Sequence, residues 1–159
     1  MQTQSNKLDF SGQNIYVGFD VHLKSWKVTI MSETLVLKTF VQPPEPKTLH
    51  RYLVNNFPGG IYHSAYEAGF CGYWIHNQLL SLGIKSIVVN PADIPTTNKE
   101  KVQKDDKRDS RKIARSLKAG ELTAIYVPSE KTLEDRAFLR TRKILTKDLS
   151  RYKNRIMSF

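Results

Sequence analysis

The sequence predicts an α/β domain with a mixed sheet flanked by helices, followed by a long helix. Segments with strand-like and helical patterns follow one another as three strands, a helix, a strand, a helix and a strand. Short connections between the first three strands favour an antiparallel meander, and the strand–helix–strand order that follows requires a mixed sheet. From about Leu133 onward, apolar residues recur at the spacing of a coiled coil.

The meander is expected over three segments near the N-terminus. Residues 14–23 (NIYVGFDVHL) form the first strand, and residues 25–33 and 35–42 supply the other two. Alternation along the first strand places Asp20 and His22 on the same side. Its apolar face carries Ile15, Val17 and Phe19, and its other face carries Tyr16, Gly18 and Asp20.

The rest of the domain alternates helices and strands. Pro46 suits the first turn of a helix that runs to about Asn56, where FPGG breaks it. A helix is expected to begin at Asp105 or Asp106 and to run to Lys118, with Gly120 as its stop. Between these two helices we expect a strand over 61–68, a helix over 72–82, a strand over 84–91 and a polar loop over 92–104.

The last helix carries an apolar seam at 4-3 spacing, with only Arg142 out of pattern. A seam of this kind favours dimerisation, and the alternative is a helix packed on the sheet of its own chain. The pattern continues to the last residue without a capping Gly, Asn or Pro, so we expect the chain to be part of a longer protein. The seam consists of Phe138, Leu145, Leu149, Tyr152, Ile156 and Phe159.

Positive charge is concentrated in the C-terminal part of the chain. The net charge is +10, yet residues 1–98 contribute only one unit of it and residues 99–159 contribute nine. Nucleic acid is the commonest partner of such a surface, because each phosphate neutralised by Lys or Arg releases counterions. A solvated helical face is the alternative.

Composition excludes several classes of protein. Cys71 is the single cysteine, so an internal disulfide framework is impossible and a reducing, cytoplasmic location is expected. No apolar run approaches the ~20 residues needed to span a bilayer, and the N-terminal residues lack the apolar region of a signal peptide.

Four carboxylates occupy positions that a role in catalysis explains better than a role in packing. Asp20 ends an apolar strand, Glu67 ends the fourth strand beside glycines, and Asp106 and Asp109 share one face of a helix. Carboxylates brought close together repel one another unless cations neutralise them, so such a cluster predicts bound Mg²⁺ or Mn²⁺. Each residue also has a structural alternative: a turn for Asp20, an exposed surface for Glu67 and a helix cap for Asp105 or Asp106.

Basic residues surround the acidic pair of the same helix. Two metal ions about 4 Å apart can activate a nucleophile and stabilise a leaving oxygen in phosphodiester chemistry. A helix that combines carboxylates able to bind metal with basic side chains able to bind backbone phosphates therefore predicts an enzyme acting on nucleic acid. The candidate nucleic-acid-binding residues are Lys104, Lys107, Arg108, Arg111, Lys112 and Arg115.

Three motifs in order, YVGFDVHLKSW, HSAYEAG and KDDKRDSRKIA, followed by a coiled-coil helix, resemble a known family. They are similar to the N-terminal RuvC-like domain of the DEDD transposases of the insertion-sequence-one-ten type. That family includes pilin-gene-inverting recombinases and bridge-RNA-guided recombinases. The resemblance covers residues 14–159 and implies a ribonuclease-H-like (RuvC-like) fold and metal-dependent DNA strand exchange.

The resemblance also implies the roles of particular residues. The catalytic, metal-binding acids would be Asp20 in GFDVH, Glu67 in YEAG, and Asp106 and Asp109 in DKRD, holding two Mg²⁺ or Mn²⁺ ions. Asp105 competes with Asp106, since Asp105 and Asp109 are four residues apart, but DKRDSRK fits the family pattern better.

The partners that the resemblance implies are the DNA ends of the element, a target DNA, a structured non-coding guide RNA and further copies of the protein, in a prokaryotic nucleoid. Residues 1–12 would form a tail, 13–128 the RuvC-like catalytic domain and 129–159 the start of the coiled coil. Family members carry a further C-terminal domain with a serine proposed as nucleophile. The chain stops before such a domain, so complete recombination by these residues alone is not expected.

Two rival functions use the same residues. A structure-selective nuclease such as a junction resolvase needs the same four acids, and a non-catalytic module for nucleic-acid binding and dimerisation needs only the basic surface and the seam. A sugar-kinase-like or actin-like ATPase shares the sheet, but this chain has no glycine-rich phosphate loop and is too short for two lobes.

Overall fold

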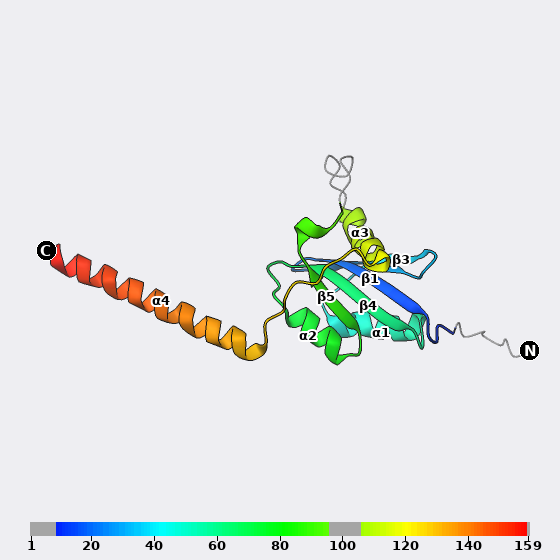
Figure 1. Cartoon of the computed structure of the whole chain (residues 1–159), viewed down its shortest axis with the longest axis horizontal. Helices are drawn as coiled ribbons and strands as arrows, with labels where there is room; N and C mark the ends of the chain where they lie inside the picture. Colours follow the sequence, from blue (N-terminus) through cyan, green and yellow to red (C-terminus); the bar gives the residue numbers. More distant parts are fainter. Residues whose placement is uncertain (1–8, 96–105, 159) are drawn as a thin grey trace, which may run out of the picture. The chain divides into compact units, whose positions relative to one another are not determined.

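The computed structural model describes residues 9–95 and 106–158 of the chain, and the side chains of residues 106–108 lie outside the described part. The chain divides into two compact units, Met1–Ile125 and Tyr126–Phe159. The first unit holds a sheet with helices on its two faces, and the second holds one long helix (Figure 1).

A five-stranded mixed sheet forms the centre of the first unit. Its order is β3-β2-β1-β4-β5, with β1–β2 and β2–β3 antiparallel and β1–β4 and β4–β5 parallel. The predicted meander and the predicted mixed sheet are therefore both confirmed. The strands are β1 (Asn14–Val21), β2 (Trp26–Met31), β3 (Val36–Gln42), β4 (Ile61–Glu67) and β5 (Lys85–Val89).

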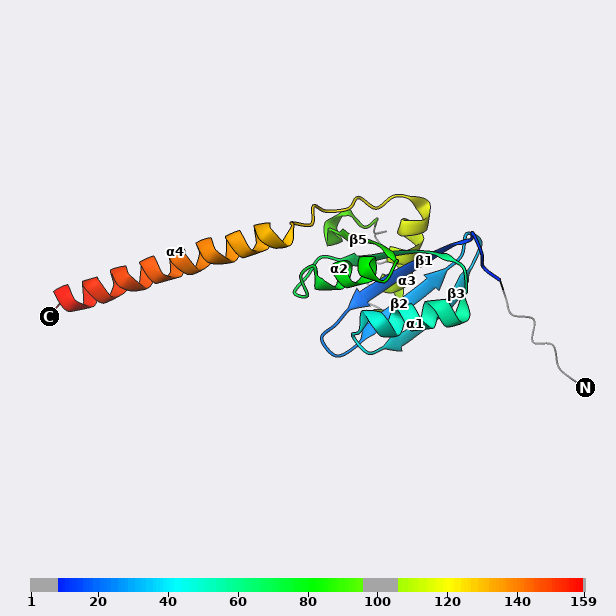
Figure 2. The ribbon, with the colours of Figure 1, turned by 90° about the horizontal axis from the view of Figure 1, so that it is seen from below.

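Helices cover both faces of this sheet (Figures 1 and 2). Helices α1 (Pro46–Asn56) and α2 (Trp74–Ser81) lie on one face, and α3 (Asp106–Ala119) lies on the other. A short 3₁₀ helix, η1 (Pro91–Asp93), follows β5. This arrangement is the ribonuclease-H-like α/β fold that the motifs predicted.

The core beneath α1 and α2 is built around an aromatic stack. The ring of Phe19 lies between the rings of Trp26 and Tyr66, with centroids 5.3 Å and 5.1 Å away. All three side chains are fully buried, as are Ile15 and Val17 on the same face of β1. Burial of large apolar side chains at about 25 cal/mol per Å² is the main force that holds α1 and α2 to the sheet.

Gly18 allows α3 to lie directly on β1. A Cβ atom at Gly18 would collide with the backbone nitrogen of Ala114 and the backbone carbonyl oxygen of Ser110. The Oγ of Ser110 also lies 2.9 Å from Oγ1 of Thr29 on β2, in a buried hydrogen bond. These contacts determine where the first turns of α3, including Asp109, lie above the sheet.

Two helices begin at residues other than those expected. The helix expected at residue 72 begins at Trp74, because Gly72 has a φ of 61°, which is incompatible with a helical start there. Helix α4 (Glu130–Met157) begins three residues earlier than expected. Ser129 caps it, with its Oγ accepting a hydrogen bond from the backbone N–H of Thr132 at 3.2 Å.

Helix α4 is 28 residues long and has no buried residue. Its seam residues Phe138, Leu145, Leu149, Tyr152 and Ile156 are all exposed, and Phe159 lies outside the described residues. None of the helices in the described part of the chain combines the length and the apolar character that crossing a bilayer requires.

Candidate active site

The carboxyl ends of two neighbouring parallel strands place Asp20 and Glu67 side by side. Phe19 pairs with Tyr66 in the β1–β4 register, so the next residues of the two strands stand at the same level. Asp20 follows Gly18 by two residues and Glu67 follows Ala65 by two, and both Gly18 and Ala65 pack against α3. Both carboxylates therefore lie on the α3 face of the sheet.

Helix α3 brings a third carboxylate to this edge. Asp109 directly precedes Ser110, the residue that bonds Thr29 of the sheet. Glu67 is half-buried, and this burial raises the pKa of its carboxyl group. The negative charges of Asp20 and Asp109 raise the pKa of Glu67 further, while Lys112 lowers it. Asp20 and Asp109 are thus close enough to Glu67 to influence its ionisation.

The fourth predicted acid, Asp106, is the first residue of α3, one turn before Asp109. Its side chain lies outside the described residues, as do those of Lys107 and Arg108, and Lys104 and Asp105 lie outside them altogether. The choice of Asp106 over Asp105 therefore stays a prediction, and so do the roles of Lys104, Lys107 and Arg108.

The proximity of the carboxylates at this edge bears on whether a metal ion could bind there. Asp20, Glu67 and Asp109 supply only oxygen donors. The pKa of Glu67 is raised first by burial and then by the negative charges of Asp20 and Asp109, and a divalent cation would offset both effects. Within the described residues, no group of three or more His, Cys, Asp or Glu side chains is arranged so that it could hold a metal ion. The donor chemistry suits Mg²⁺ or Mn²⁺, and the metal site stays a prediction.

His22 contacts the first of these acids. Its Nε2 lies 2.9 Å from Oδ2 of Asp20. The His22 side chain is 57% exposed and that of Asp20 is 21% exposed. The pair therefore lies at the rim of the acidic edge, the sheet edge that carries Asp20, Glu67 and Asp109. The turn that follows β1 holds His22 in place, since its backbone N–H donates to the carbonyl oxygen of Ser25. His22 therefore orients the Asp20 carboxylate from the solvent side.

Lys27 is a neighbour of the site that sequence reasoning missed. It pairs with Asp20 across the antiparallel β1–β2 ladder, and it lies on the same face as Thr29, which contacts α3. Side chains directly opposite each other in such a ladder have Cβ atoms about 5 Å apart. No motif in the sequence marks Lys27, because only the strand register places it beside Asp20.

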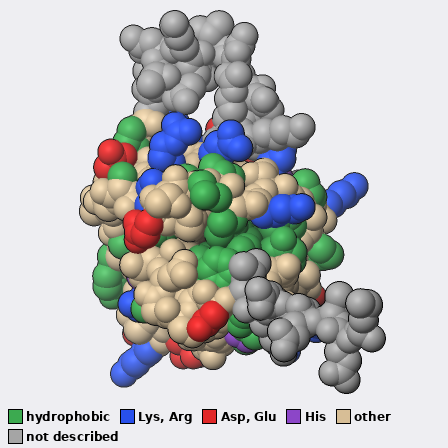
Figure 3. Space-filling model, turned by 90° about the vertical axis from the view of Figure 1, so that its right-hand side faces the viewer, with side chains coloured by type: hydrophobic (Ala, Val, Ile, Leu, Met, Phe, Trp, Pro, Cys, Tyr) green, Lys and Arg blue, Asp and Glu red, His purple; other side chains and the backbone are tan. Residues whose placement is uncertain are grey.

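The outer face of α3 is basic. Arg111 and Arg115 are exposed, and Lys112 is partly buried towards Glu67. Lys118, at the other end of the helix, donates a hydrogen bond to the backbone carbonyl oxygen of Glu33. Figure 3 shows Lys and Arg side chains around the upper part of one face of the molecule, at the level of α3 in Figure 1. Of these cations of α3, Lys112 lies close enough to the acidic edge to act on Glu67, whereas Lys118 lies at the opposite end of the sheet.

The strand order and the acidic edge define the class of protein: a ribonuclease-H-like α/β domain with carboxylates at the ends of β1 and β4 and on the helix above them. A family model described as a transposase, of the DEDD insertion-sequence-one-ten type, matches residues 17–159. The chain belongs to this transposase family.

Curated relatives agree with this family. The chain is 30% identical over 151 residues to the transposase for insertion sequence element IS1533 of Leptospira borgpetersenii, covering 92% of this chain and 43% of the relative. It is 41% identical over 96 residues to the putative transposase y4rJ of Sinorhizobium fredii, covering 57% of this chain and 24% of the relative. The chain thus spans less than half the length of these relatives.

Proposed function

We propose that this chain is the catalytic domain of a DNA transposase or recombinase that cleaves and exchanges DNA strands with the help of Mg²⁺. The convergence of Asp20, Glu67 and Asp109 at one sheet edge carries this proposal. Membership of a transposase family supports DNA as the substrate. A structured non-coding RNA that directs the reaction, and assembly into a homo-oligomer through the α4 seam, belong to the same proposal.

The acids would hold the metal and the helix above them would hold the substrate. Asp20, Glu67, Asp106 and Asp109 would bind one or two Mg²⁺ or Mn²⁺ ions, which stabilise developing negative charge and activate a nucleophile in phosphodiester chemistry. His22 would keep the Asp20 carboxylate in one orientation through the 2.9 Å contact. The burial of Glu67 excludes part of the surrounding water, which strengthens its interactions with cations.

Basic side chains would lead the DNA backbone to the acids. Arg111 and Arg115 are exposed on the helix that carries Asp109, so they can neutralise phosphates next to the site. Lys27 stands on the opposite side of Asp20 from Glu67, since β1 pairs with β2 on one side and with β4 on the other. A phosphate held between Lys27 and α3 would lie directly over the carboxylates.

The first test is metal binding. Titration calorimetry with Mn²⁺ on the 159-residue chain should give binding that the Asp20→Asn/Asp109→Asn variant loses, with and without structured RNA. Asp135→Asn, on exposed α4, is the matched control and should bind as the unmodified chain does. Absence of binding under every condition would contradict a metal site built by these residues alone and would favour a nucleic-acid-binding module.

The second test is strand chemistry, measured with this chain joined to the C-terminal domain that the family resemblance implies. Asp20→Asn should reduce Mg²⁺-dependent nicking of element-end DNA at least about 100-fold, since loss even of residues that support metal ligands costs 10–100-fold. Asp135→Asn should retain activity. Nicking without strand joining in the unmodified protein would identify a structure-selective nuclease, and unchanged exchange in Asp20→Asn would refute the site.

A further inference from the structure

Helix α4 carries a continuous row of cations along one face. Between residues 136 and 157 the chain has eight Lys or Arg and a single acid, Asp148. Five of the cations recur every three or four residues, so they fall on one side of a helix with 3.6 residues per turn. We call these five the basic stripe: Arg136, Arg140, Lys143, Lys147 and Arg151.

The basic stripe lies opposite the apolar seam. Arg136 and Leu145 are nine residues apart, and so are Lys143 and Tyr152. Nine residues are two and a half turns, so each stripe residue has a seam residue on the far side of the helix. A second helix covering the seam would therefore leave the basic stripe facing outward and accessible.

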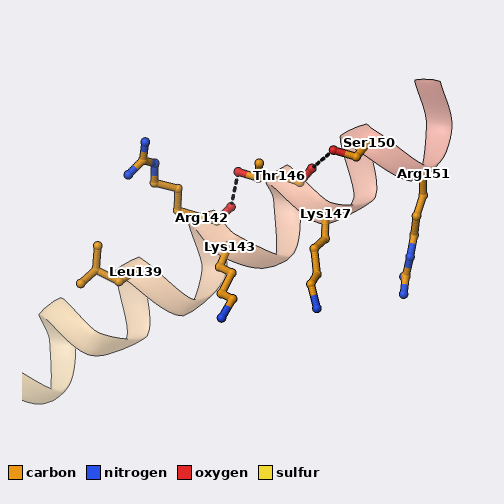
Figure 4. A pocket seen from close by; sticks show the side chains of 7 residues that line it. All are labelled: Leu139, Arg142, Lys143, Thr146, Lys147, Ser150 and Arg151. Atoms are coloured by element: carbon orange, nitrogen blue, oxygen red, sulfur yellow. Dashed lines mark hydrogen bonds between the residues drawn. The ribbon is translucent and has the colours of Figure 1, made fainter. Parts of the chain in front are cut away.

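The side chains of the stripe point into solvent in one direction. Figure 4 shows Lys143, Lys147 and Arg151 extending side by side from three successive turns, and all three are exposed. The neighbouring hydroxyls of Thr146 and Ser150 donate to backbone carbonyl oxygens of the preceding turn, at 2.9 Å and 3.0 Å. These two hydroxyls already donate hydrogen bonds within the helix, so the cationic side chains are the groups left to bind a partner.

These cations far outnumber the acids that could pair with them. Asp148 contacts Arg151, with Oδ1 and Nη1 3.3 Å apart. A single acid cannot neutralise eight basic residues, so this part of α4 keeps a net charge of +7. A regular row of excess charge favours an anionic partner with regularly spaced charges.

We propose that the basic stripe binds the phosphate backbone of double-stranded DNA, as a surface separate from α3. The stripe is about 22 Å long from Arg136 to Arg151, at 1.5 Å per residue. The major groove of B-form DNA admits an α-helix with phosphates along both rims, whereas that of A-form RNA is too narrow. The inference rests on the proposed action on DNA.

The narrow seam argues against a lipid surface as the partner. Helices that lie in a membrane interface bury a broad apolar face. The α4 seam has about one apolar residue per turn, which is the pattern of a helix that pairs with another helix. The exposed Leu139, Ile144 and Met157 fall outside the seam on different sides of the helix, so they do not widen it into one broad apolar face. Contact with lipid would also place the basic stripe on the side away from the anionic headgroups.

The test compares two triple variants of the chain with equal loss of charge. Lys143→Gln/Lys147→Gln/Arg151→Gln removes the middle of the stripe. The control, Lys131→Gln/Arg142→Gln/Lys153→Gln, removes three cations on the seam side of the helix, where Arg142 occupies a seam position itself. Gln is a good helix former, so both variants should keep α4 helical, which circular dichroism checks, and light scattering checks the oligomeric state.

The readout is the salt dependence of DNA affinity, measured with a chelator present so that the acidic edge plays no part. Losing three phosphate contacts should lower the slope of log K against log salt by about 2.7. Between about 50 and 200 mM salt the unmodified chain should then lose about 40-fold more affinity than the stripe variant. The control variant should keep the slope of the unmodified chain.

Several outcomes would overturn the inference. Equal slopes for the two variants would mean that general charge, and not the stripe, attracts DNA. A stripe variant that loses affinity for duplex RNA or for anionic vesicles while keeping its DNA slope would assign the surface to those partners instead. Failure of the proposed function appears elsewhere, as Mg²⁺-dependent nicking that survives Asp20→Asn.

Discussion

Helices α3 and α4 are both amphipathic and basic, yet only α3 is buried against a sheet. In α3, Ser110, Ile113 and Ala114 are buried and the helix lies on β1 over Gly18. In α4 no residue is buried, although its apolar residues recur at regular helical spacing. Similar local patterns thus lead to two outcomes: one helix is packed on the sheet with Asp109 near its edge, and the other is exposed along its whole described length.

This contrast has an energetic side. Most of the stability of a helix in a protein comes from packing of its apolar face, and isolated helices are marginal in water. The packing of α3 on β1, β2 and β4 supplies that contribution within the first unit. We therefore expect α3 to unfold together with the sheet, and α4 to depend on whatever covers its seam.

The largest expected effect comes from Gly18→Val. The new side chain must displace the backbone of Ser110 and Ala114, so α3 cannot keep its position. Overpacking of this kind costs 1–3 kcal/mol, and a clash with backbone should cost about 3 kcal/mol or more. Gly69→Ala, where a Cβ meets nothing within 4 Å, is the control for urea unfolding of the first unit. Equal stability of the two variants would contradict the close approach of α3 to β1.

A pair of core and seam substitutions sharpens the comparison. Ile113→Ala leaves a cavity between α3 and the sheet, so the free energy of unfolding should fall by about 2–4 kcal/mol. Leu149→Ala removes a side chain that is 55% exposed, so unfolding of the first unit should change by less than about 0.5 kcal/mol. Sedimentation should instead detect weaker self-association of Leu149→Ala. An unaltered association constant would argue against the seam as the interface.

A smaller effect on the stability of the first unit is expected when the pH is lowered. Burial lowers the pKa of His63, Lys85 lowers it further and Glu33 opposes the shift. The Nε2 atom of the neutral His63 ring lies 3.0 Å from Oδ1 of Asn14, and the ring stacks on Tyr16. Because the unfolded chain protonates His63 more readily, its contribution to stability is complete above about pH 6.5 and is lost as pH falls through the lowered pKa.

Unfolding curves measured from neutral to acid pH check this prediction. The first unit should lose stability over that range, and His63→Gln should show a shallower loss. Helix α4 provides an internal comparison because residues 126–159 contain no histidine. Hydrogen exchange that reports an equal loss of protection in α4 would assign the pH dependence to something other than His63.

Much of the fold could be predicted because local patterns persist in the folded chain. The alternation in NIYVGFDVHL predicted β1 and the side on which Asp20 lies, and the turn residues predicted the meander. Gly72 misled the prediction of α2, since its positive φ delays the helix to Trp74. The apolar pattern alone placed the start of α4 about three residues late, because Ser129, which caps the helix, stands before that pattern begins.

By itself, the sequence determined which residues could do chemistry. It placed acids at two strand ends and at a helix start, cations around them, and an apolar seam on the last helix, because these properties depend only on residue type and spacing. The tertiary structure decided which of these side chains are neighbours in space. Lys27 lies opposite Asp20 through strand register, and Asp109 reaches the sheet edge because Gly18 has no side chain. Register and close backbone approach depend on residues far apart in the chain, and no local pattern encodes them.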